Sequence, residues 1–200
     1  IKDNHFYFKN SLGTLGGGNH FIEIDKDKND NLYLIIHTGS RNFGKQIAEY
    51  HQYKAKKLIE TVMINKEEYQ KIYKDLEYLP LEMGGKEYLE DMKTAQKFAS
   101  LNRKRIAETL LKYLDLSLTD TEHFETIHNY ISFKDNIIRK GAISAHKDEK
   151  VLIPLNMRDG SLIAIGKGSQ KWNFSAPHGA GRLFSRTEAT KRLTMDEFTN

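Results

Sequence analysis

A long block with helical periodicity, set between two segments with strand character, most constrains the fold of this chain. Within residues 45–115, two helical stretches are separated by Leu79-Pro80 and Gly84-Gly85. The residues that recur at helical spacing are Ile47, Tyr50, Lys54, Leu58 and Val62, and then Tyr88, Met92, Ala95, Ala99, Ile106, Leu110 and Leu114. Such stripes cover another helix or a sheet. We therefore expect a packing module, with its Tyr and Met side chains in the core rather than at a cofactor.

The segments on either side of this block have strand patterns. Residues 6–44 are Gly-rich, and their apolar runs at 21–24 and 32–36 flank a turn signal at 27–31, which predicts a β-hairpin or adjacent strands. The later strand-like segments are 126–133, 141–145, 151–154 and 161–166, and a basic helix follows from about Arg186 to Leu193. The pattern predicts an α+β fold, with a helical insertion at about 45–115 between two β-rich parts of residues 1–200.

Composition excludes several classes of protein. No apolar run approaches the roughly 18 residues that a membrane-spanning helix needs. The chain has no cysteine, which excludes a disulfide framework, a cysteine-type zinc site and a thiol nucleophile, and is compatible with the cytoplasm. The 31 Lys and Arg against 27 Asp and Glu leave a formal charge of +4. This charge is weak evidence for an anionic partner, because solvated surface accounts for much of it.

Three histidines lie at the edges of expected strands, beside small or polar residues. His20 precedes the run at 21–24, His37 ends the run at 32–36, and His128 lies in the segment 126–133. Imidazole is a common ligand of divalent transition metals, and strand ends hold ligands rigidly. Each histidine alone is better explained as a structural residue, whereas three in similar settings favour a metal site. Spacing does not show that they converge.

His178 has a different setting, because small residues follow it at 179–181. Small residues let a ligand approach the backbone closely. We expect a helix that starts near Gly181 and points its N–H groups at an anion, with Arg182 and Arg186 on that helix to contact phosphate. A neutral histidine there can attack phosphorus and form a covalent intermediate. A Gly-rich turn with a helix cap explains this segment equally well.

Other candidates are weaker. The Gly-rich loop 13–18 matches neither the dinucleotide-binding pattern nor the P-loop. The remaining histidines have polar or helical neighbours, and we expect all of them at the surface: His5, His51, His123 and His146. Basic residues that could contact a nucleic-acid backbone are better explained as a solvated face: Arg139, Lys140, Lys147, Lys150, Lys191 and Arg192.

Taken together, these segments resemble the RtcB family of RNA-splicing ligases. Residues 13–23 resemble the family's Gly-rich Asn-His-Phe motif, and residues 37–41 resemble its His-Ser-Gly-Ser-Arg motif. The segments 128–130 and 139–142 follow in the expected order, and residues 178–186 resemble the motif of the guanylylated histidine. Five ordered motifs across nearly the whole chain are far more specific than any one of them.

The resemblance implies a GTP- and Mn²⁺-dependent ligase that joins RNA 2′,3′-cyclic phosphate or 3′-phosphate ends to 5′-hydroxyl ends. It implies RNA partners such as tRNA halves or damaged ends, two Mn²⁺ ions and an optional activator protein, but no membrane. It makes His178 the nucleophile that carries GMP. The other implied sites are metal ligands His20, His37 and His128; GTP contacts Asn19, Phe21, Glu23, Asn156, Ser161, His178, Gly179, Ala180 and Gly181; and RNA or phosphate contacts Arg41, Arg182 and Arg186.

The sequence also departs from the family. The family's N-terminal Cys and Asp and its C-terminal Lys and Tyr have no counterparts in residues 1–200, so we expect a piece of a longer ligase, or else a naturally short relative. The family's Pro-Gly-Ser-Met-Gly stretch is replaced at residues 154–158, where Leu155 fills space that is otherwise open and Arg158 fills it or adds a phosphate contact. Two alternatives therefore remain: a module of this fold that binds RNA ends or nucleotide without ligating, and an inactive structural fragment.

Overall fold

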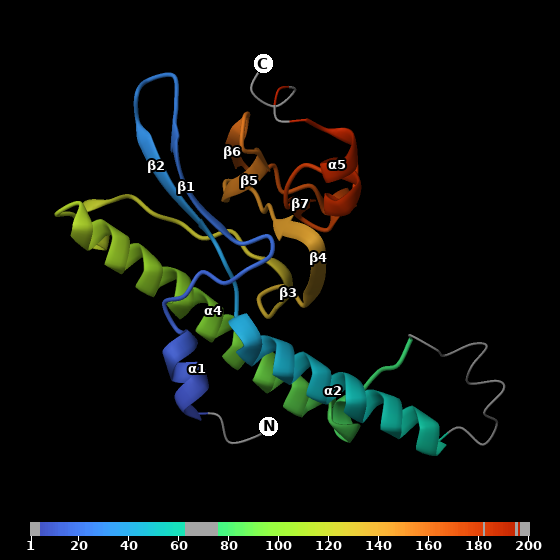
Figure 1. The fold of residues 1–200 in the computed structure, drawn as a ribbon. Helices are drawn as coiled ribbons and strands as arrows, with labels where there is room; N and C mark the ends of the chain where they lie inside the picture. Colours follow the sequence, from blue (N-terminus) through green and yellow to red (C-terminus); the bar gives the residue numbers. More distant parts are fainter. Residues whose placement is uncertain (1–4, 63–75, 182, 195, 197–200) are drawn as a thin grey trace. The chain divides into compact units, whose positions relative to one another are not determined.

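The computed structural model describes residues 5–62, 76–181, 183–194 and 196, and the chain divides into two compact units (Figure 1). Unit 1 is Ile1–His123 and unit 2 is Phe124–Asn200. Each unit contains helices and strands, which confirms the expected α+β class. No helix in the described part of the chain has both the length and the apolar character that crossing a membrane requires.

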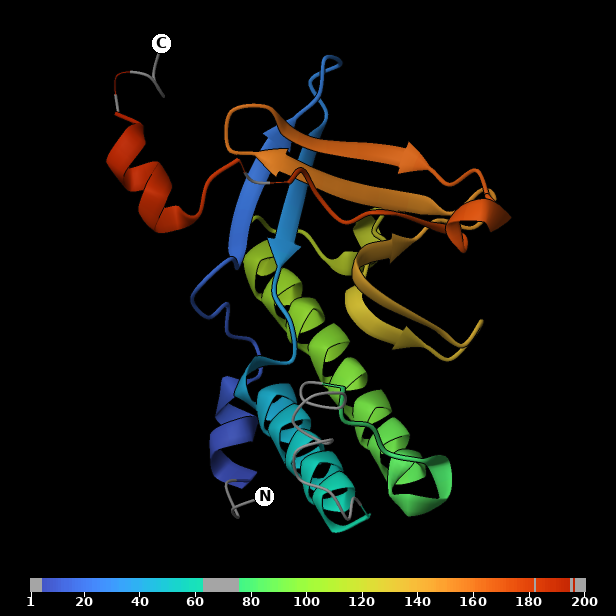
Figure 2. The ribbon, with the colours of Figure 1, turned by 90° about the vertical axis from the view of Figure 1, so that its right-hand side faces the viewer.

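Unit 1 combines a pair of long helices with a β-hairpin. Its helices are α1 (His5–Ser11), α2 (Arg41–Val62) and α4 (Gly85–Tyr113), with the 3₁₀ turns η2 (Leu81–Met83) and η3 (Leu118–Asp120). Strands β1 (Phe21–Lys26) and β2 (Leu32–His37) pair antiparallel, which confirms the predicted hairpin. Helices α2 and α4 lie side by side (Figure 2). Helix α1 arises in a segment expected to be strand-like, because Phe8 packs against Phe43 of α2 with ring centroids 5.2 Å apart.

The buried face of α2 differs from the predicted stripe. Its buried side chains are Ile47, His51, Ala55 and Ile59. Tyr50, which the stripe placed inside, is 38% exposed, and the surface position expected for His51 is wrong. His51 is buried because Asp91 of α4 supplies a polar partner, with its Oδ2 2.8 Å from the histidine Nε2. On α4, Ala95 is buried as predicted, whereas Leu114 beyond its end is largely exposed.

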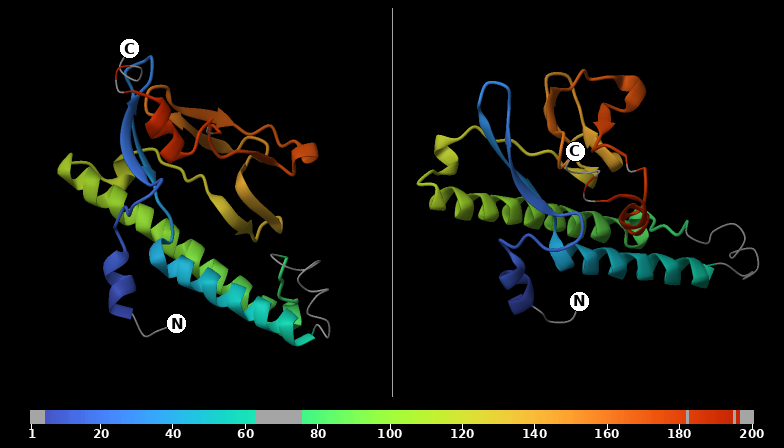
Figure 3. Two further views of the ribbon diagram at one scale, coloured as in Figure 1. Left: turned by 45° about the vertical axis from the view of Figure 1, so that its right-hand side comes forward. Right: turned by 45° about the horizontal axis from the view of Figure 1, so that its top comes forward.

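Unit 2 is built from two antiparallel sheets (Figure 3). The first has the order β3-β4-β7, with β3 (His128–Ser132), β4 (Ile137–Ser144) and β7 (Ser175–Pro177), and the second pairs β5 (Lys150–Asn156) with β6 (Gly160–Ile165). A short turn, η4 (Gln170–Trp172), precedes β7. The core contains Ile143, Ala145 and Val151, against which Ile153, Ala164 and Ala176 pack. All four predicted strand segments are confirmed, whereas β7 was too short to stand out.

Helix α5 (Arg186–Arg192) confirms the basic helix but corrects the helix start expected near Gly181. Its N-cap is Ser185, whose hydroxyl accepts a hydrogen bond of 3.1 Å from the Glu188 N–H. A serine cap is a stronger start signal than glycine, which is a poor helix former. No helix N-terminus therefore begins directly after His178. Arg182 lies outside the described residues, and only the backbone of Arg186 is described.

Candidate active site

In unit 1, the loop before β1 and the end of β2 bring two predicted metal ligands together. The rings of His20 and His37 have centroids 6.3 Å apart. Phe21 pairs with His37 across the hairpin, and their ring centroids are 5.0 Å apart. Because side chains alternate along a strand, Glu23 shares the face of Phe21, and both are half-buried while Ile22 is exposed. The face of the hairpin that carries Phe21, Glu23 and His37 is therefore its more buried face.

Arg41, at the start of α2, extends its guanidinium over the Gly-rich loop. Its Nε donates to Thr14 Oγ1 at 3.2 Å, and its Nη1 lies 3.3 Å from His20 Nδ1. A Cβ at Gly16 would overlap this guanidinium, so the close approach requires glycine there. Burial first, and then the charge of Arg41, lower the pKa of His20. The neutral imidazole that a metal requires is therefore favoured.

Asn102 of α4 connects the Gly-rich loop to the end of β2 and was not predicted as a site residue. It is fully buried. Its Oδ1 accepts from the N–H groups of Gly13 at 2.7 Å and Thr14 at 3.1 Å. Its Nδ2 donates to the carbonyls of Thr14 at 3.1 Å and Gly39 at 3.3 Å. The helical block, expected only to pack, thus positions the loop that carries Asn19 and His20.

We predict that Asn102→Leu lowers the free energy of unfolding by about 2–4 kcal/mol, because it leaves several partly buried backbone groups unpaired. Urea unfolding followed by far-UV circular dichroism measures the change. The exposed Lys97 on the same helix provides the control, since Lys97→Ala removes no such contact. Equal midpoints for the two variants would contradict the role assigned to Asn102.

In unit 2, His178 lies directly after β7 and beside His128 at the start of β3. Their ring centroids are 4.7 Å apart. His178 Nδ1 is 2.7 Å from the carbonyl oxygen of Gly141. Because a carbonyl only accepts hydrogen bonds, this geometry places a proton on Nδ1, and in the neutral ring the lone pair is then on Nε2. No sequence pattern indicates this partner, because it is a backbone group.

The residues after His178 pack against β5. The N–H of Ala180 donates to the carbonyl of Pro154 at 3.1 Å, and a Cβ at Gly179 would lie 3.1 Å from the same oxygen. Pro154 pairs with Ser161 of β6. Unit 2 therefore places His178 beside His128 and packs Gly179 and Ala180 against the strand that pairs with Ser161.

Asn156, expected at the GTP site, builds the turn between β5 and β6. Its Oδ1 accepts from the N–H groups of Arg158 and Asp159, both at 2.9 Å, and its Nδ2 donates to Asp159 Oδ2 at 2.7 Å. The exposed Arg158 has its Nε 3.1 Å from Asp159 Oδ1. The residues that replace the family's glycines thus form a self-contained polar turn.

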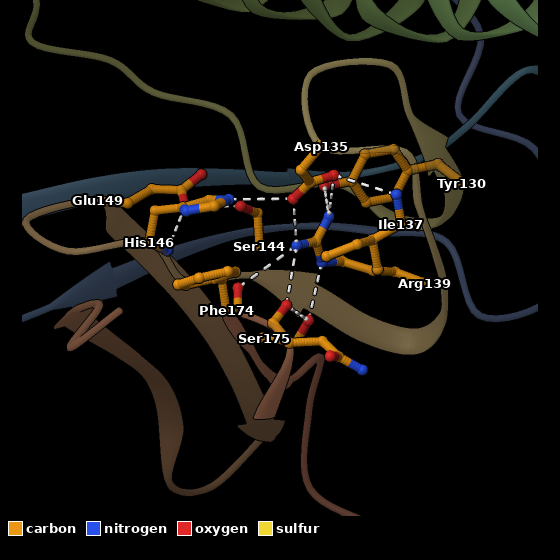
Figure 4. A network of polar contacts seen from close by, with 10 residues as sticks. Tyr130, Asp135, Ile137, Arg139, Ser144, His146, Glu149, Phe174 and Ser175 are labelled. Carbon is orange, nitrogen blue, oxygen red and sulfur yellow. Dashed lines mark hydrogen bonds and ion pairs between the residues drawn. The ribbon is translucent and has the colours of Figure 1, made fainter. Parts of the chain in front are cut away.

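A second polar cluster surrounds Arg139, which is 2% exposed rather than part of a solvated face (Figure 4). Its Nη2 lies 2.8 Å from Asp135 Oδ2, and its Nε donates to Ser175 Oγ of β7 at 2.9 Å. The hydrogen bond from this guanidinium holds the pKa of the Asp135 carboxyl well below its usual range. Arg139 thereby ties β4 to the strand that leads to His178.

His146 also belongs to this cluster, so its expected surface position is corrected. Its Nε2 lies 3.0 Å from Asp135 Oδ2, and its ring stacks on Phe174 with centroids 4.7 Å apart. The side chain is 28% exposed. His123 is exposed as predicted, and the side chain of His5 lies outside the described part.

The described residues contain no group of three or more His, Asp or Glu side chains arranged to hold a metal. Two histidine pairs are present instead, one in each unit: His20 with His37, and His128 with His178. Each pair places imidazole nitrogens beside small, polar segments. The arrangement within each unit suits metal ligation or nucleophilic chemistry.

Comparison with known proteins finds a match over residues 3–200 to the family described as tRNA-splicing ligase RtcB. The chain is 35% identical over 205 residues to RNA-splicing ligase RtcB1 of Escherichia coli strain ATCC 25922, covering 93% of this chain and 48% of that protein. It is 29% identical over 237 residues to tRNA-splicing ligase RtcB of Nanoarchaeum equitans, and the match covers 94% of this chain and 48% of that protein. The chain thus spans about half the length of these relatives. No solved structure matches significantly.

Proposed function

Because the chain belongs to the RtcB family of tRNA-splicing ligases, we propose that it forms part of the catalytic core of an RNA ligase with that family's fold. The reaction joins a 2′,3′-cyclic phosphate or 3′-phosphate RNA end to a 5′-hydroxyl end and uses GTP. The substrates are RNA ends such as those of tRNA halves or damaged RNA. The contact between His178 Nδ1 and the Gly141 carbonyl at 2.7 Å supports the proposal most directly.

His178 is the proposed nucleophile. Its Nε2 lone pair forms a bond to the α-phosphorus of GTP, while the bond from that phosphorus to the bridging oxygen breaks and pyrophosphate leaves with the electron pair. The Gly141 carbonyl accepts a hydrogen bond from the Nδ1–H throughout and stabilises the charge that develops on the ring. An oxygen of the RNA 3′-phosphate then displaces His178 from GMP, and the 5′-hydroxyl displaces GMP from the RNA. A cyclic end first needs opening by water.

Among the proposed nucleotide contacts, two lie on the hairpin of unit 1. Phe21 and Glu23 are half-buried on one hairpin face, where the Glu23 carboxylate can accept from the guanine N1–H and amino group. The other proposed contacts are Asn19, Asn156, Ser161, Gly179, Ala180 and Gly181. The proposed contacts to phosphate or the RNA end are Arg41, Arg182 and Arg186, whose guanidinium groups suit phosphate oxygens.

His20, His37 and His128 are the proposed ligands of Mn²⁺, with two ions in the complete enzyme. The donors fit such an ion, because they are imidazoles at strand ends and because burial and Arg41 keep His20 neutral. Bound Mn²⁺ would neutralise triphosphate charge as a Lewis acid. The contact of Arg41 with His20 Nδ1 engages that nitrogen, so Arg41 has to give way if the metal takes it.

We predict that His37→Ala weakens Mn²⁺ binding by about tenfold or more, since even changes around a metal ligand cost that much. Isothermal titration calorimetry with Mn²⁺ alone measures the affinity. His123→Ala removes an exposed histidine of the same unit and serves as the control. An affinity that is equal in both variants would argue against His37 as a ligand.

The proposed function is tested by incubating the protein with GTP and Mn²⁺ and measuring its intact mass, alongside a form extended to the length of the relatives. We expect a GMP-sized gain in mass on His178, and joining of a 2′,3′-cyclic phosphate RNA to a 5′-hydroxyl RNA. Binding of RNA or nucleotide without any adduct would instead favour the non-ligating module. Absence of adduct and binding in both forms would favour a structural fragment.

A further inference from the structure

We propose that Asn129 is a positioning residue that sets the tautomer of His178 by holding Gly141 in its left-handed conformation. This inference rests on the proposed function only in giving the tautomer a chemical purpose. The tautomer itself follows from contacts within unit 2 and can be measured without GTP, metal or RNA.

Asn129 lies at an irregularity in the pairing of β3 with β4. His128 is opposite Ile143 and Tyr130 is opposite Arg139, so one residue of β3 faces the longer segment 140–142 of β4. Asn129 has a φ of +57° and Gly141 a φ of +66°. Asparagine and glycine are the residues that best tolerate this left-handed region. Both strands therefore depart from regular pairing at the same point.

The side chain of Asn129 replaces a ladder hydrogen bond that is lost at this bulge. Its Oδ1 accepts from the Gly141 N–H at 2.7 Å. The carbonyl of the same residue, Gly141, accepts from His178 Nδ1 at 2.7 Å. One glycine thus connects the asparagine amide to the histidine ring.

The strand on either side of Gly141 is fixed by separate contacts. Arg139 is buried and bonded to Ser175 of β7, while Ile143 is 1% exposed and pairs with Ala176. Gly141 itself is exposed and has no side chain to anchor it. Its N–H lies in the peptide that precedes it and its carbonyl in the peptide that follows, which leads to Ala142, paired with Pro177 of β7. The φ of Gly141, which sets the angle between these two peptides, therefore depends on the hydrogen bond to Asn129 rather than on packing.

Loss of this hydrogen bond would let the backbone of Gly141 rotate, and the carbonyl would then move away from His178. The proton could then reside on either ring nitrogen, and the fraction of rings with the lone pair on Nε2 would fall. Because Asn129 is exposed, its removal leaves no cavity in the core. The expected effect is thus on the histidine rather than on the fold.

The test is the ¹⁵N spectrum of the His178 imidazole in the full chain, recorded at a pH at which the ring is neutral. We expect a single Nδ1–H tautomer in the wild type and in Asn129→Asp, which keeps an acceptor oxygen. We expect mixed tautomers in Asn129→Gly, which keeps the left-handed backbone but loses the acceptor. In Asn129→Ser the side chain is too short to reach the Gly141 N–H, so this variant should behave like Asn129→Gly. It takes the place of Asn129→Gly if that variant does not fold.

Wild-type ring shifts in the folded glycine or serine variant would overturn the proposal. A second readout is the single-turnover rate of GMP-adduct formation in the extended form, which we expect to fall about tenfold or more in Asn129→Gly and to recover in Asn129→Asp. A tautomer change with no adduct in any variant, wild type included, would overturn the proposed function but leave the positioning role intact. Normal adduct formation in Asn129→Gly, with the tautomer of His178 unchanged, would overturn the positioning role but support the proposed function.

Discussion

His178→Ala is expected to abolish the GMP adduct while leaving unit 2 folded. The substitution removes the Nε2 lone pair that the proposed reaction requires, so adduct formation should fall by at least about a thousandfold. The cost in stability should be small, because His178 is only half-buried and the Gly141 carbonyl that it releases is accessible to water. Intact-mass measurement after incubation with GTP and Mn²⁺ detects the adduct, and urea unfolding verifies the fold.

His123→Ala is a matched control for this experiment. His123 is an exposed histidine whose Nδ1 also lies near a backbone carbonyl, 3.3 Å from that of Thr121, but no role in the reaction is proposed for it. Its substitution should leave adduct formation unchanged. A labelled adduct that persists in His178→Ala would place the nucleophile on another residue and would overturn the proposed mechanism.

The elements that were predicted correctly are those whose local patterns agree with their tertiary setting. The hairpin at residues 21–37 has two β-prone runs around a polar turn, and its strands form as predicted. The buried face of α2 was predicted wrongly because His51 is polar, and its burial depends on Asp91, which lies on another helix. A partner that is remote in sequence leaves no local pattern.

The contacts of the candidate site likewise divide into those that a local sequence pattern predicts and those that it does not. His20 and His37 could be paired from the sequence, because they close adjacent ends of one hairpin. A sequence signal for Asn102 does exist, because it is a polar residue on an otherwise apolar helical stripe and such a residue needs polar partners. The Gly141 carbonyl has no signal in the sequence, because every residue carries a backbone carbonyl. Only the left-handed backbone at the bulge turns this carbonyl toward His178.

Asp135→Ala is expected to destabilise unit 2 by about 3–5 kcal/mol at neutral pH, because it leaves the buried charge of Arg139 unpaired. Combining it with Arg139→Met should recover much of the loss, since a buried pair can be replaced by apolar residues at little cost. Urea unfolding of the full chain, followed by fluorescence of Trp172 in this unit, measures both effects.

The acid dependence provides an independent check on the Asp135–Arg139 pair. The folded pKa of Asp135 is depressed below its ordinary value of 3.8, so its contribution is complete above that value and is lost as the pH falls toward the folded pKa. Asp135→Ala should therefore remove part of the acid destabilisation. Glu188→Ala breaks a pair of the same i,i+4 spacing with Arg192 on an exposed helix, and should cost at most about 0.5 kcal/mol. An equally small loss of stability in Asp135→Ala would contradict this prediction. It would mean that the buried Arg139, which connects β4 to Ser175 of β7, does not depend on the Asp135 carboxylate.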